Sequence, residues 1–448
     1  MPEQLNSTLA KSSRAFFFAT IVLLPFRYRF LQISRPIEPI WSDYTDFILY
    51  ASDVALLLTL ATWLLHLYLH PRRLRTGPAF LTLPLLGLTL AALVTSATSI
   101  DPALAFYHSI RLIILFALYL YVINQVTTIR QLLAPLSVML SIQASIAILQ
   151  ALTQRSVGLQ SLGEFELNPA WSGISVVWTE SIRALRAYGL TDHPNLLAGC
   201  LVFAMLLLLV WHLFEGQSMD PLTFTFMAMG ALALFFTYSR SAWLALFVAL
   251  IFIGYHRFVR QKRLPAWKEV AFFLALLLML FPFIWANIEL VGLRLGEQIS
   301  FQELQPELGS LQERRVLASA GNTVFVENAI LGVGLGASPQ AFMKTFPSFP
   351  VNYAPVHNVV LSAALETGLF GGLFYLTVIA APWFALFLNR RIKYTPDLIA
   401  ATAALLALAV VGLFDVYPWL LAPGRLWQYL AWGLWARFYV DASSKAKA

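Results

Sequence analysis

Arginine and histidine residues recur in four short polar segments of an otherwise apolar chain. The segments contain Arg186 with His193 and Asn195, Ser239 with Arg240, the pair Arg314 and Arg315, and His357 with Asn358. A guanidinium group binds phosphate through paired hydrogen bonds, and unperturbed histidine exchanges protons between about pH 5 and 8. These residue types predict an anion-binding site beside a group that can accept a proton.

The composition indicates what kind of protein carries these segments. The chain has 448 residues, of which 59% are hydrophobic and 12% charged, and its mean hydropathy is +0.71. Soluble domains average about 25% charged residues, so we expect an all-α, polytopic membrane protein. The net charge of +7 does not indicate nucleic-acid binding, because the basic residues form short clusters between apolar runs. Cys200 is the only cysteine, which excludes an intrachain disulfide.

Apolar runs of about 17–25 residues can cross about 30 Å of hydrocarbon as helices. The sequence predicts about twelve such spans within a single integral membrane domain, residues 1–448. The expected spans are 15–33, 46–69, 79–97, 104–126, 131–153, 193–214, 221–237, 241–256, 269–288, 369–389, 397–417 and 424–440.

Lysine and arginine concentrate in the cytoplasmic loops of membrane proteins. With both termini in the cytoplasm, nearly every short basic cluster falls on that side, including those at 72–75, 257–268 and 390–393. The same arrangement predicts two outer loops, 154–192 and 289–356, of which the second is large and mostly helical. All four polar segments are then extracytoplasmic.

The first segment, 183–195, ends an outer loop. Thr191 or Asp192, followed by a proline, is typical of a helix start, where exposed N–H groups can bind an anion. Arg186 would contact a phosphate beside it. The alternative is a capped helix start in which His193 only satisfies a carbonyl group.

The second segment, 237–241, is a tight outer turn between two spans. Arg240 is flanked by hydroxyl residues, among them Ser239. A guanidinium held on such a turn suits a diphosphate. The alternative is an arginine that extends to the lipid headgroups.

The long loop carries the remaining candidates. Residues 311–328 predict a helix with Val316, Ala320, Val324 and Phe325 on one face and the arginine pair at its start. The glycines at 332, 334 and 336 permit a turn, but without a preceding strand they do not predict a dinucleotide fold. We expect 358–367 to be a short helix broken near Gly368. Glu366 would be a hydrogen-bond partner at that break, since a charged carboxylate is costly at mid-membrane.

Arginines that converge on a histidine suit transfer from a diphosphate-activated donor. The arginines would stabilise the charge on the leaving diphosphate, and the histidine would take a proton from an acceptor hydroxyl. The outer loops contain no paired Asp-x-Asp motif, and Glu164 and Glu166 are the nearest acidic pair. We therefore predict that no metal and no other cofactor is required.

Four motifs, in order, resemble the O-antigen ligase and polymerase superfamily. They are Arg-x-x-Gly-x-x-x-His-Pro-Asn at 186–195, Thr-x-Ser-Arg at 237–240, Glu-Asn-Ala-Ile-Leu-Gly-Val-Gly-Leu-Gly at 327–336, and His-Asn-x7-Glu-x-Gly at 357–368. The resemblance extends over about 180–375. It implies a GT-C-like, metal-independent inverting glycosyltransferase that acts on undecaprenyl-diphosphate-linked glycans at the periplasmic face of the bacterial cytoplasmic membrane.

The resemblance also implies roles for individual residues. His357 corresponds to the family's essential loop histidine. Arg240 and either Arg314 or Arg315 correspond to its diphosphate-binding arginines, with Arg186 nearby. A tryptophan is common four residues after the loop arginine in the family, whereas Ala318 or Ser319 stands there in this chain. The motif therefore does not distinguish Arg314 from Arg315. The acceptor could be another glycan, lipid A core or a protein hydroxyl.

A transporter or flippase for a lipid-linked polysaccharide is the competing class. Such proteins usually carry polar residues at the membrane midplane and show two related halves. The main ionisable residues expected inside spans are His66, His108 and Arg111, and no internal duplication is visible. Arg111 lies close enough to the outer end of its span to reach an outer cavity.

Overall fold

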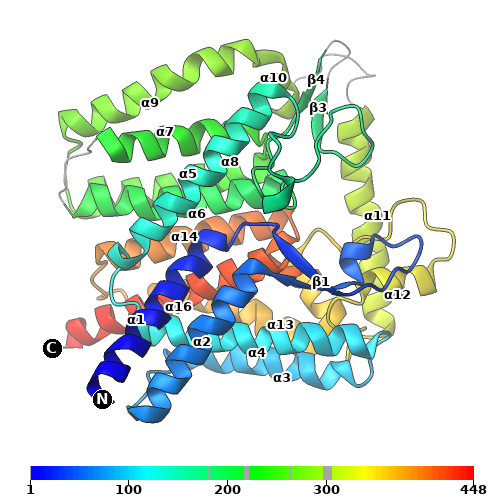
Figure 1. Ribbon diagram of the computed structural model, residues 1–448, viewed down its shortest axis with the longest axis horizontal. Helices are drawn as coiled ribbons and strands as arrows, with labels where there is room; N and C mark the ends of the chain where they lie inside the picture. The colour runs from blue at the N-terminus through cyan, green and yellow to red at the C-terminus, as the bar shows by residue number, and fades with distance from the viewer. Residues whose placement is uncertain (1, 179–181, 216–220, 263, 296–304, 448) are drawn as a thin grey trace.

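The computed structural model describes residues 2–178, 182–215, 221–262, 264–295 and 305–447. The fold is nearly all-α, as predicted, and consists of a bundle of long helices with a smaller group of loops, short helices and hairpins at one end (Figure 1). The chain is a multi-pass membrane protein, because many of these helices are long and apolar.

Each predicted span overlaps a helix, although the first overlaps only in part. The bounds are α1 Pro2–Leu23, α2 Ala51–Leu69, α3 Ala79–Ser96, α4 Pro102–Gln125, α5 Arg130–Thr153, α6 Pro194–Phe214, α7 Pro221–Phe236, α8 Arg240–Gly254, α9 Trp267–Ala286, α13 Val359–Leu388, α14 Pro396–Phe414 and α16 Ala422–Lys447. Within the described residues, nine helices are long and apolar enough to cross a membrane, a set without α1, α7 and α16. The count of twelve therefore stays a prediction.

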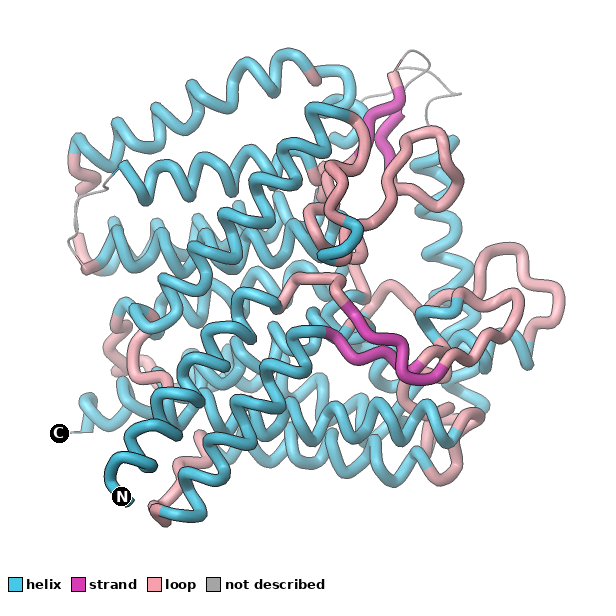
Figure 2. The backbone as a smooth tube through the Cα atoms, in the orientation of Figure 1, coloured by secondary structure: helices cyan, strands magenta, loops and turns pink. Residues whose placement is uncertain are grey.

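The shorter elements lie between these helices. They are α10 Ile288–Leu295, α11 Gln305–Glu327, α12 Ser338–Thr345, α15 Tyr417–Leu420, the 3-10 helices η1 Ser42–Tyr44 and η2 Gln160–Leu162, the π-helix η3 Tyr255–Arg260, and strands β1 Arg29–Ile33, β2 Phe47–Tyr50, β3 Val176–Trp178 and β4 Arg183–Leu185. The strands form two antiparallel hairpins, in which Phe30 pairs with Leu49 and Val177 with Ala184 (Figure 2).

The first helix ends earlier than the sequence predicts. The expected span 15–33 stops at Leu23, and β1 begins at Arg29. Pro25 disfavours helical geometry at the residue before it. Beyond the helix, Arg27 and Arg29 are held outside the bundle by ion pairs with Asp192 and Asp43, of 2.9 and 2.8 Å.

Helix burial distinguishes the centre of the bundle from its edge. In the most apolar 18-residue stretch of each helix, 89% of the residues are buried in α6, 67% in α14 and 6% in α9. Helix α6 packs against α5, α7, α8 and α14, so it is surrounded by protein, whereas α9 presents almost its whole surface to the outside. The candidate site at the start of α6 is thus anchored to the most enclosed helix.

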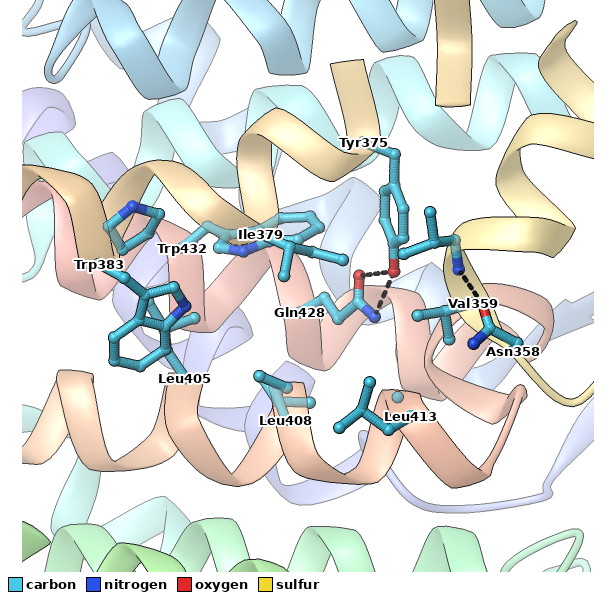
Figure 3. Close-up of a pocket in the computed structure, with 14 residues that line it drawn as sticks. Asn358, Val359, Tyr375, Ile379, Trp383, Leu405, Leu408, Leu413, Gln428 and Trp432 are labelled. Atoms are coloured by element: carbon cyan, nitrogen blue, oxygen red, sulfur yellow. Dashed lines mark hydrogen bonds between the residues drawn. The ribbon is translucent and has the colours of Figure 1, made fainter. Parts of the chain in front are cut away.

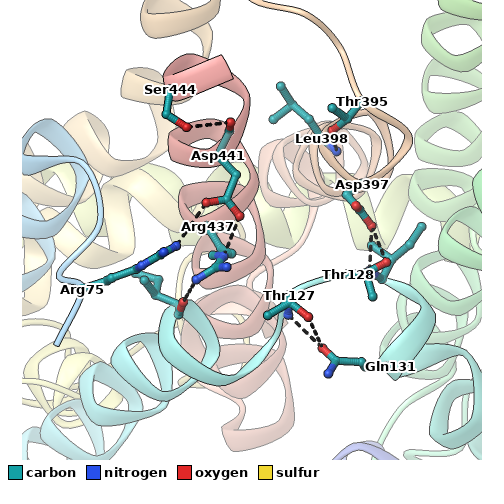
Figure 4. A network of polar contacts seen from close by, with 12 residues as sticks. Arg75, Thr127, Thr128, Gln131, Thr395, Asp397, Leu398, Arg437, Asp441 and Ser444 are labelled. Carbon is teal, nitrogen blue, oxygen red and sulfur yellow. Dashed lines mark hydrogen bonds and ion pairs between the residues drawn. The ribbon is translucent and has the colours of Figure 1, made fainter. Parts of the chain in front are cut away.

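The two chain termini lie at the same end of the bundle, and the hairpins, α11 and α12 lie at the other (Figures 1 and 2). Polar contacts tie the terminal end together. Asp441 of α16 accepts from Arg75 at 3.1 Å and from Arg437 at 2.8 Å (Figure 4). Asp397 of α14 accepts from Thr128 at 3.0 Å. The four polar segments predicted from the sequence share the opposite end.

Helix α13 is interrupted at Gly368, where φ is 70° and ψ is −178°. The glycine-rich turn docks against this break: the Val333 and Gly334 N–H groups donate to Leu365 O and Glu366 O, both at 3.0 Å. A Cβ atom on residue 368 would lie 2.2 Å from Ile330 O. The break thus joins the long loop to the membrane helices.

We expect Gly368→Ala to lower the free energy of unfolding by about 1–3 kcal/mol, because alanine is strained at this backbone geometry and its methyl group meets a carbonyl oxygen. Thermal unfolding in detergent measures the change. Gly254→Ala is the matched control, since that glycine has no atom closer than 3.7 Å to an added Cβ. Equal unfolding temperatures for the two variants would contradict the expectation.

Candidate functional site

His193 begins α6 and caps it. Its Nδ1 atom accepts from the Asn195 N–H at 3.1 Å, and its Nε2 atom lies 3.2 Å from Ser175 Oγ. The prediction of Thr191 or Asp192 as the cap was wrong. Thr191 instead donates to two carbonyl groups, and Asp192 is paired with Arg27.

Arg186 connects segments that are distant in the sequence. It is buried, and its Nε atom donates to Thr237 O at 2.7 Å. Another of its guanidinium nitrogens donates to Asn195 Oδ1, and the Asn195 amide in turn donates to Asp415. Arg186 therefore fixes the end of β4 against both the 237–241 turn and the start of α6.

The 237–241 turn is held in place by a residue that the sequence analysis missed. Arg294 of α10 donates to Tyr238 O through Nε and Nη2, at 3.1 and 2.9 Å. Ser239 is buried in the turn, and Arg240 begins α8 with a half-buried side chain. A basic residue in the amphipathic helix α10, whose Leu290 and Leu293 are buried, was the sequence signal that could have drawn attention to Arg294.

His357 and His193 share an electrostatic environment. Burial, together with the nearby charges of Arg186, His357, Arg314 and Arg294, lowers the pKa of His193 to about 3. Burial also lowers the pKa of His357; Asp415 opposes this shift and Arg314 adds to it. These interactions bring two histidines and three arginines from separate segments into one site.

The arginine pair in α11 divides between two environments. Arg314 is half-buried and acts on both histidines, whereas Arg315 is exposed. Successive residues on a helix point about 100° apart, so the two side chains face different directions. Ala320 and Val324 pack the helix against a cluster that includes Val356, next to His357. That packing sets the direction in which Arg314 points.

Two of the supporting candidates have local structural contacts. Asn358 caps α13, and its Oδ1 atom accepts from Val360 N and Leu361 N at 3.1 and 3.0 Å. Glu366 is fully buried and accepts from Ser338 Oγ at 2.8 Å and Trp419 Nε1 at 2.9 Å. Glu366 thus holds α12 and α15 against the break in α13.

Arg111 lies in a different polar cluster. It forms a 2.6 Å ion pair with Asp53 and donates to Ile48 O and to the Tyr107 hydroxyl, at 2.9 and 2.7 Å. None of the contacts recorded for the described residues joins Arg111 to the two histidines.

An apolar groove begins beside the site. It follows α13 from Asn358 to Trp383 and is walled by Leu405 and Leu408 of α14 and by Trp432 of α16 (Figure 3). Tyr375 and Gln428 form its main polar feature, with hydrogen bonds of 3.0 and 3.2 Å to each other. The site therefore combines a cationic cluster with an apolar groove.

The fold and the site define a polytopic membrane protein with a cluster of arginines and histidines at one end of its bundle. Residues 224–376 match the family model described as O-antigen ligase, which confirms the resemblance to that superfamily over the segment with Arg240, Arg314 and His357. At this coarse level, the match supports a membrane enzyme of the O-antigen ligase or polymerase type, a family whose partners are in general a lipid-linked glycan and an acceptor. Comparison with curated proteins gives no match.

Proposed function

We propose that the protein is a metal-independent, inverting glycosyltransferase that moves a glycan from an undecaprenyl-diphosphate carrier to an acceptor hydroxyl. The main support is that Arg186, Arg294 and Arg314 act on His193 from three segments, and that Arg314 also acts on His357. A cluster in which three arginines face one histidine favours a diphosphate. The apolar groove beside Asn358 would accept the polyprenyl chain.

His357 is the general base in this proposal. The acceptor hydroxyl oxygen attacks the anomeric carbon, the bond from that carbon to the diphosphate oxygen breaks, and the hydroxyl proton moves to the imidazole. A single displacement inverts the anomeric centre. Arg186, Arg240, Arg294 and Arg314 hold the undecaprenyl diphosphate that leaves, while Asp415 favours the imidazolium that forms.

The proposed orientation has both termini in the cytoplasm and the site at the outer face of a bacterial cytoplasmic membrane. The short connections after α2, α8 and α13 carry the basic clusters at 72–75, 257–263 and 390–393. Because positive charge favours the cytoplasmic side, the end of the bundle with those connections is the inner one.

The pH dependence tests the role of His357. The base must be neutral, and its neutral fraction grows as the pH rises through its pKa. Since that pKa is lowered from 6.5, we expect the acid limb of kcat/KM to have its midpoint below pH 6.5. Asp415→Asn removes an interaction that raises the pKa, so it should move the midpoint lower still. A midpoint above 6.5 in the wild type would argue against this base.

Divalent-ion removal tests the role of the arginines. If guanidinium groups supply the positive charge for the leaving diphosphate, EDTA should leave the transfer rate unchanged within about twofold. The measurement is transfer by detergent-purified protein with and without EDTA. Loss of activity that Mg²⁺ or Mn²⁺ restores would show that metal is required.

A reconstituted assay separates this proposal from a flippase. Purified protein in vesicles receives a lipid-diphosphate glycan and candidate acceptors, and the products are separated by chromatography. A transferase converts the donor to undecaprenyl diphosphate and a glycosylated acceptor. A flippase moves intact donor to the opposite leaflet, and that result would defeat the proposed function.

A further inference from the structure

A second cationic site lies between the start of α16 and helix α4. Arg425 is 3% exposed; its Nε atom donates to Trp419 O, and its Nη1 atom lies 3.4 Å from His108 Nδ1. Its Nη2 atom is buried without a hydrogen-bond partner among the described residues. A buried charge without a close partner is destabilising, and a bound anion would relieve that cost.

The carboxylates near Arg425 are already engaged. Glu366 attracts Arg425, but its two oxygens accept from Ser338 and Trp419. Asp53 is paired with Arg111, which repels Arg425. Within the described residues no carboxylate forms an ion pair with Arg425, so its guanidinium group remains able to bind an anion.

Two cavities meet at these arginines. Arg111, Arg425 and Tyr107 line both of them. The more polar of the two, called the polar cavity below, lies toward Asp43 and Tyr44. The other has a volume of about 160 Å³ and is lined mainly by leucine and isoleucine of α2 and α4. An anionic lipid has the same order of parts: a hydrocarbon chain, a charged group and a polar head.

The apolar cavity opens toward the outside of the bundle. Leu57 of α2 and Ile110 of α4 line it and are 40% and 41% exposed. Helices α2 and α4 both belong to the set long and apolar enough to cross a membrane, and they pack against each other (Figure 1). Membrane lipid can therefore reach the cavity from the side.

The polar cavity leads toward the candidate site. Tyr44 lines it and interacts electrostatically with Asp415 and Glu313, and Asp415 also acts on His357. Asp46 lies along this cavity, as does Asp43, whose carboxylate is held by Arg29 at 2.8 Å. Carboxylate oxygens accept hydrogen bonds from sugar hydroxyls, so the cavity suits uncharged sugar residues beyond the phosphate.

We propose that Arg425 and Arg111 bind the phosphate of a second lipid, whose hydrocarbon chain lies between α2 and α4 and whose sugars extend toward His357. This inference rests on the proposed function and specifies its acceptor: the acceptor hydroxyl is carried by a phosphate-bearing glycolipid and not by a protein. The donor diphosphate and the acceptor phosphate occupy separate cationic sites on either side of the reacting atoms.

Photo-crosslinking to the full-length protein tests the site. The probe is dioleoyl phosphatidic acid with a diazirine in one acyl chain, and mass spectrometry maps the labelled peptides. We expect labelling of residues 51–69 and 102–125, reduced about tenfold by Arg425→Gln. Arg437→Gln is the matched control on the same helix, since Arg437 is paired with Asp441 at 2.8 Å. Its labelling should equal that of the wild type.

A second variant and two further probes give independent results. Leu57→Trp fills the apolar cavity and leaves every arginine in place, so it should also reduce labelling, whether or not Arg425→Gln folds well. Diacylglycerol with the same diazirine should label weakly, and inorganic phosphate should compete poorly. Labelling that is unchanged in Arg425→Gln, or equal with the neutral lipid, would overturn the proposal.

Transfer kinetics separate this inference from the proposed function. With a lipid-borne acceptor, Arg425→Gln should raise the acceptor KM about tenfold and leave the donor KM unchanged. If the wild type transferred no glycan but α2 and α4 were still labelled, the proposed transferase function and the acceptor assignment would both be wrong. Only the lipid-binding site would remain. Transfer to a protein hydroxyl that Arg425→Gln does not affect would overturn the acceptor assignment alone.

Discussion

His357→Ala is expected to lower kcat for glycan transfer by about 10²–10⁴-fold, because a positioned general base contributes about that factor. The donor KM should change little, since the proposed mechanism assigns diphosphate binding to arginines from other segments. The measurement is steady-state release of undecaprenyl diphosphate. Added imidazole should restore part of the activity, as it can take the proton in place of the missing side chain.

His357→Gln provides the control for shape. Glutamine keeps hydrogen-bonding groups but cannot accept a proton at neutral pH, so it should be as inactive as alanine. Thermal unfolding of both variants should resemble the wild type, because His357 Nδ1 makes no hydrogen bond to any described residue. A folded His357→Ala protein with wild-type kcat would exclude this residue as the base.

Arg314→Gln and Arg315→Gln are expected to differ strongly. Arg314 acts on both histidines of the site, whereas Arg315 is exposed on the same helix. Loss of one preorganised group that stabilises transition-state charge costs about 10²–10³ in kcat. Arg314→Gln should show a loss of that size, and Arg315→Gln should stay within about threefold of the wild type.

This pair is internally matched, since both variants remove one positive charge from neighbouring positions of α11. Net charge and helix propensity therefore change equally. Equal losses would indicate a general effect of charge on the outer face, and a larger loss in Arg315→Gln would reverse the proposed assignment. Binding of undecaprenyl diphosphate, measured separately, should weaken in Arg314→Gln only.

Helix positions could be predicted well from the sequence because hydrocarbon restricts the backbone to forms that satisfy their own hydrogen bonds. An apolar run such as 194–214 has few alternatives to a helix. The break at Gly368 could also be predicted from the sequence, because three glycines interrupt an apolar stretch that is too long for one crossing. The end of α1 could not be predicted, because it depends on ion pairs between Arg27 and Asp192 and between Arg29 and Asp43. These partners are not adjacent in the sequence, and they hold the two arginines outside the bundle.

The candidate site could be predicted from the sequence only in part. Arg186, Arg240 and His357 stand in motifs whose spacing drew attention to them, and the structure brings Arg186 and His357 to His193 and Arg314. Asp415 follows Asn195 by 220 positions, and no local pattern indicates that they touch. The amphipathic pattern of α10 marks Arg294 as a basic residue on a packed helix, but it does not indicate that Arg294 contacts Tyr238 O. Tertiary packing, and not sequence spacing, decides which charges meet.

The most direct test is an experimental structure of the protein with undecaprenyl diphosphate bound. The account predicts phosphate oxygens within about 2.7–3.2 Å of guanidinium nitrogens of Arg314 and of Arg186, Arg240 or Arg294. It also predicts the prenyl chain in the groove along α13 and the His357 ring facing the terminal phosphate. A diphosphate bound away from these arginines, with the His357 ring directed elsewhere, would contradict it.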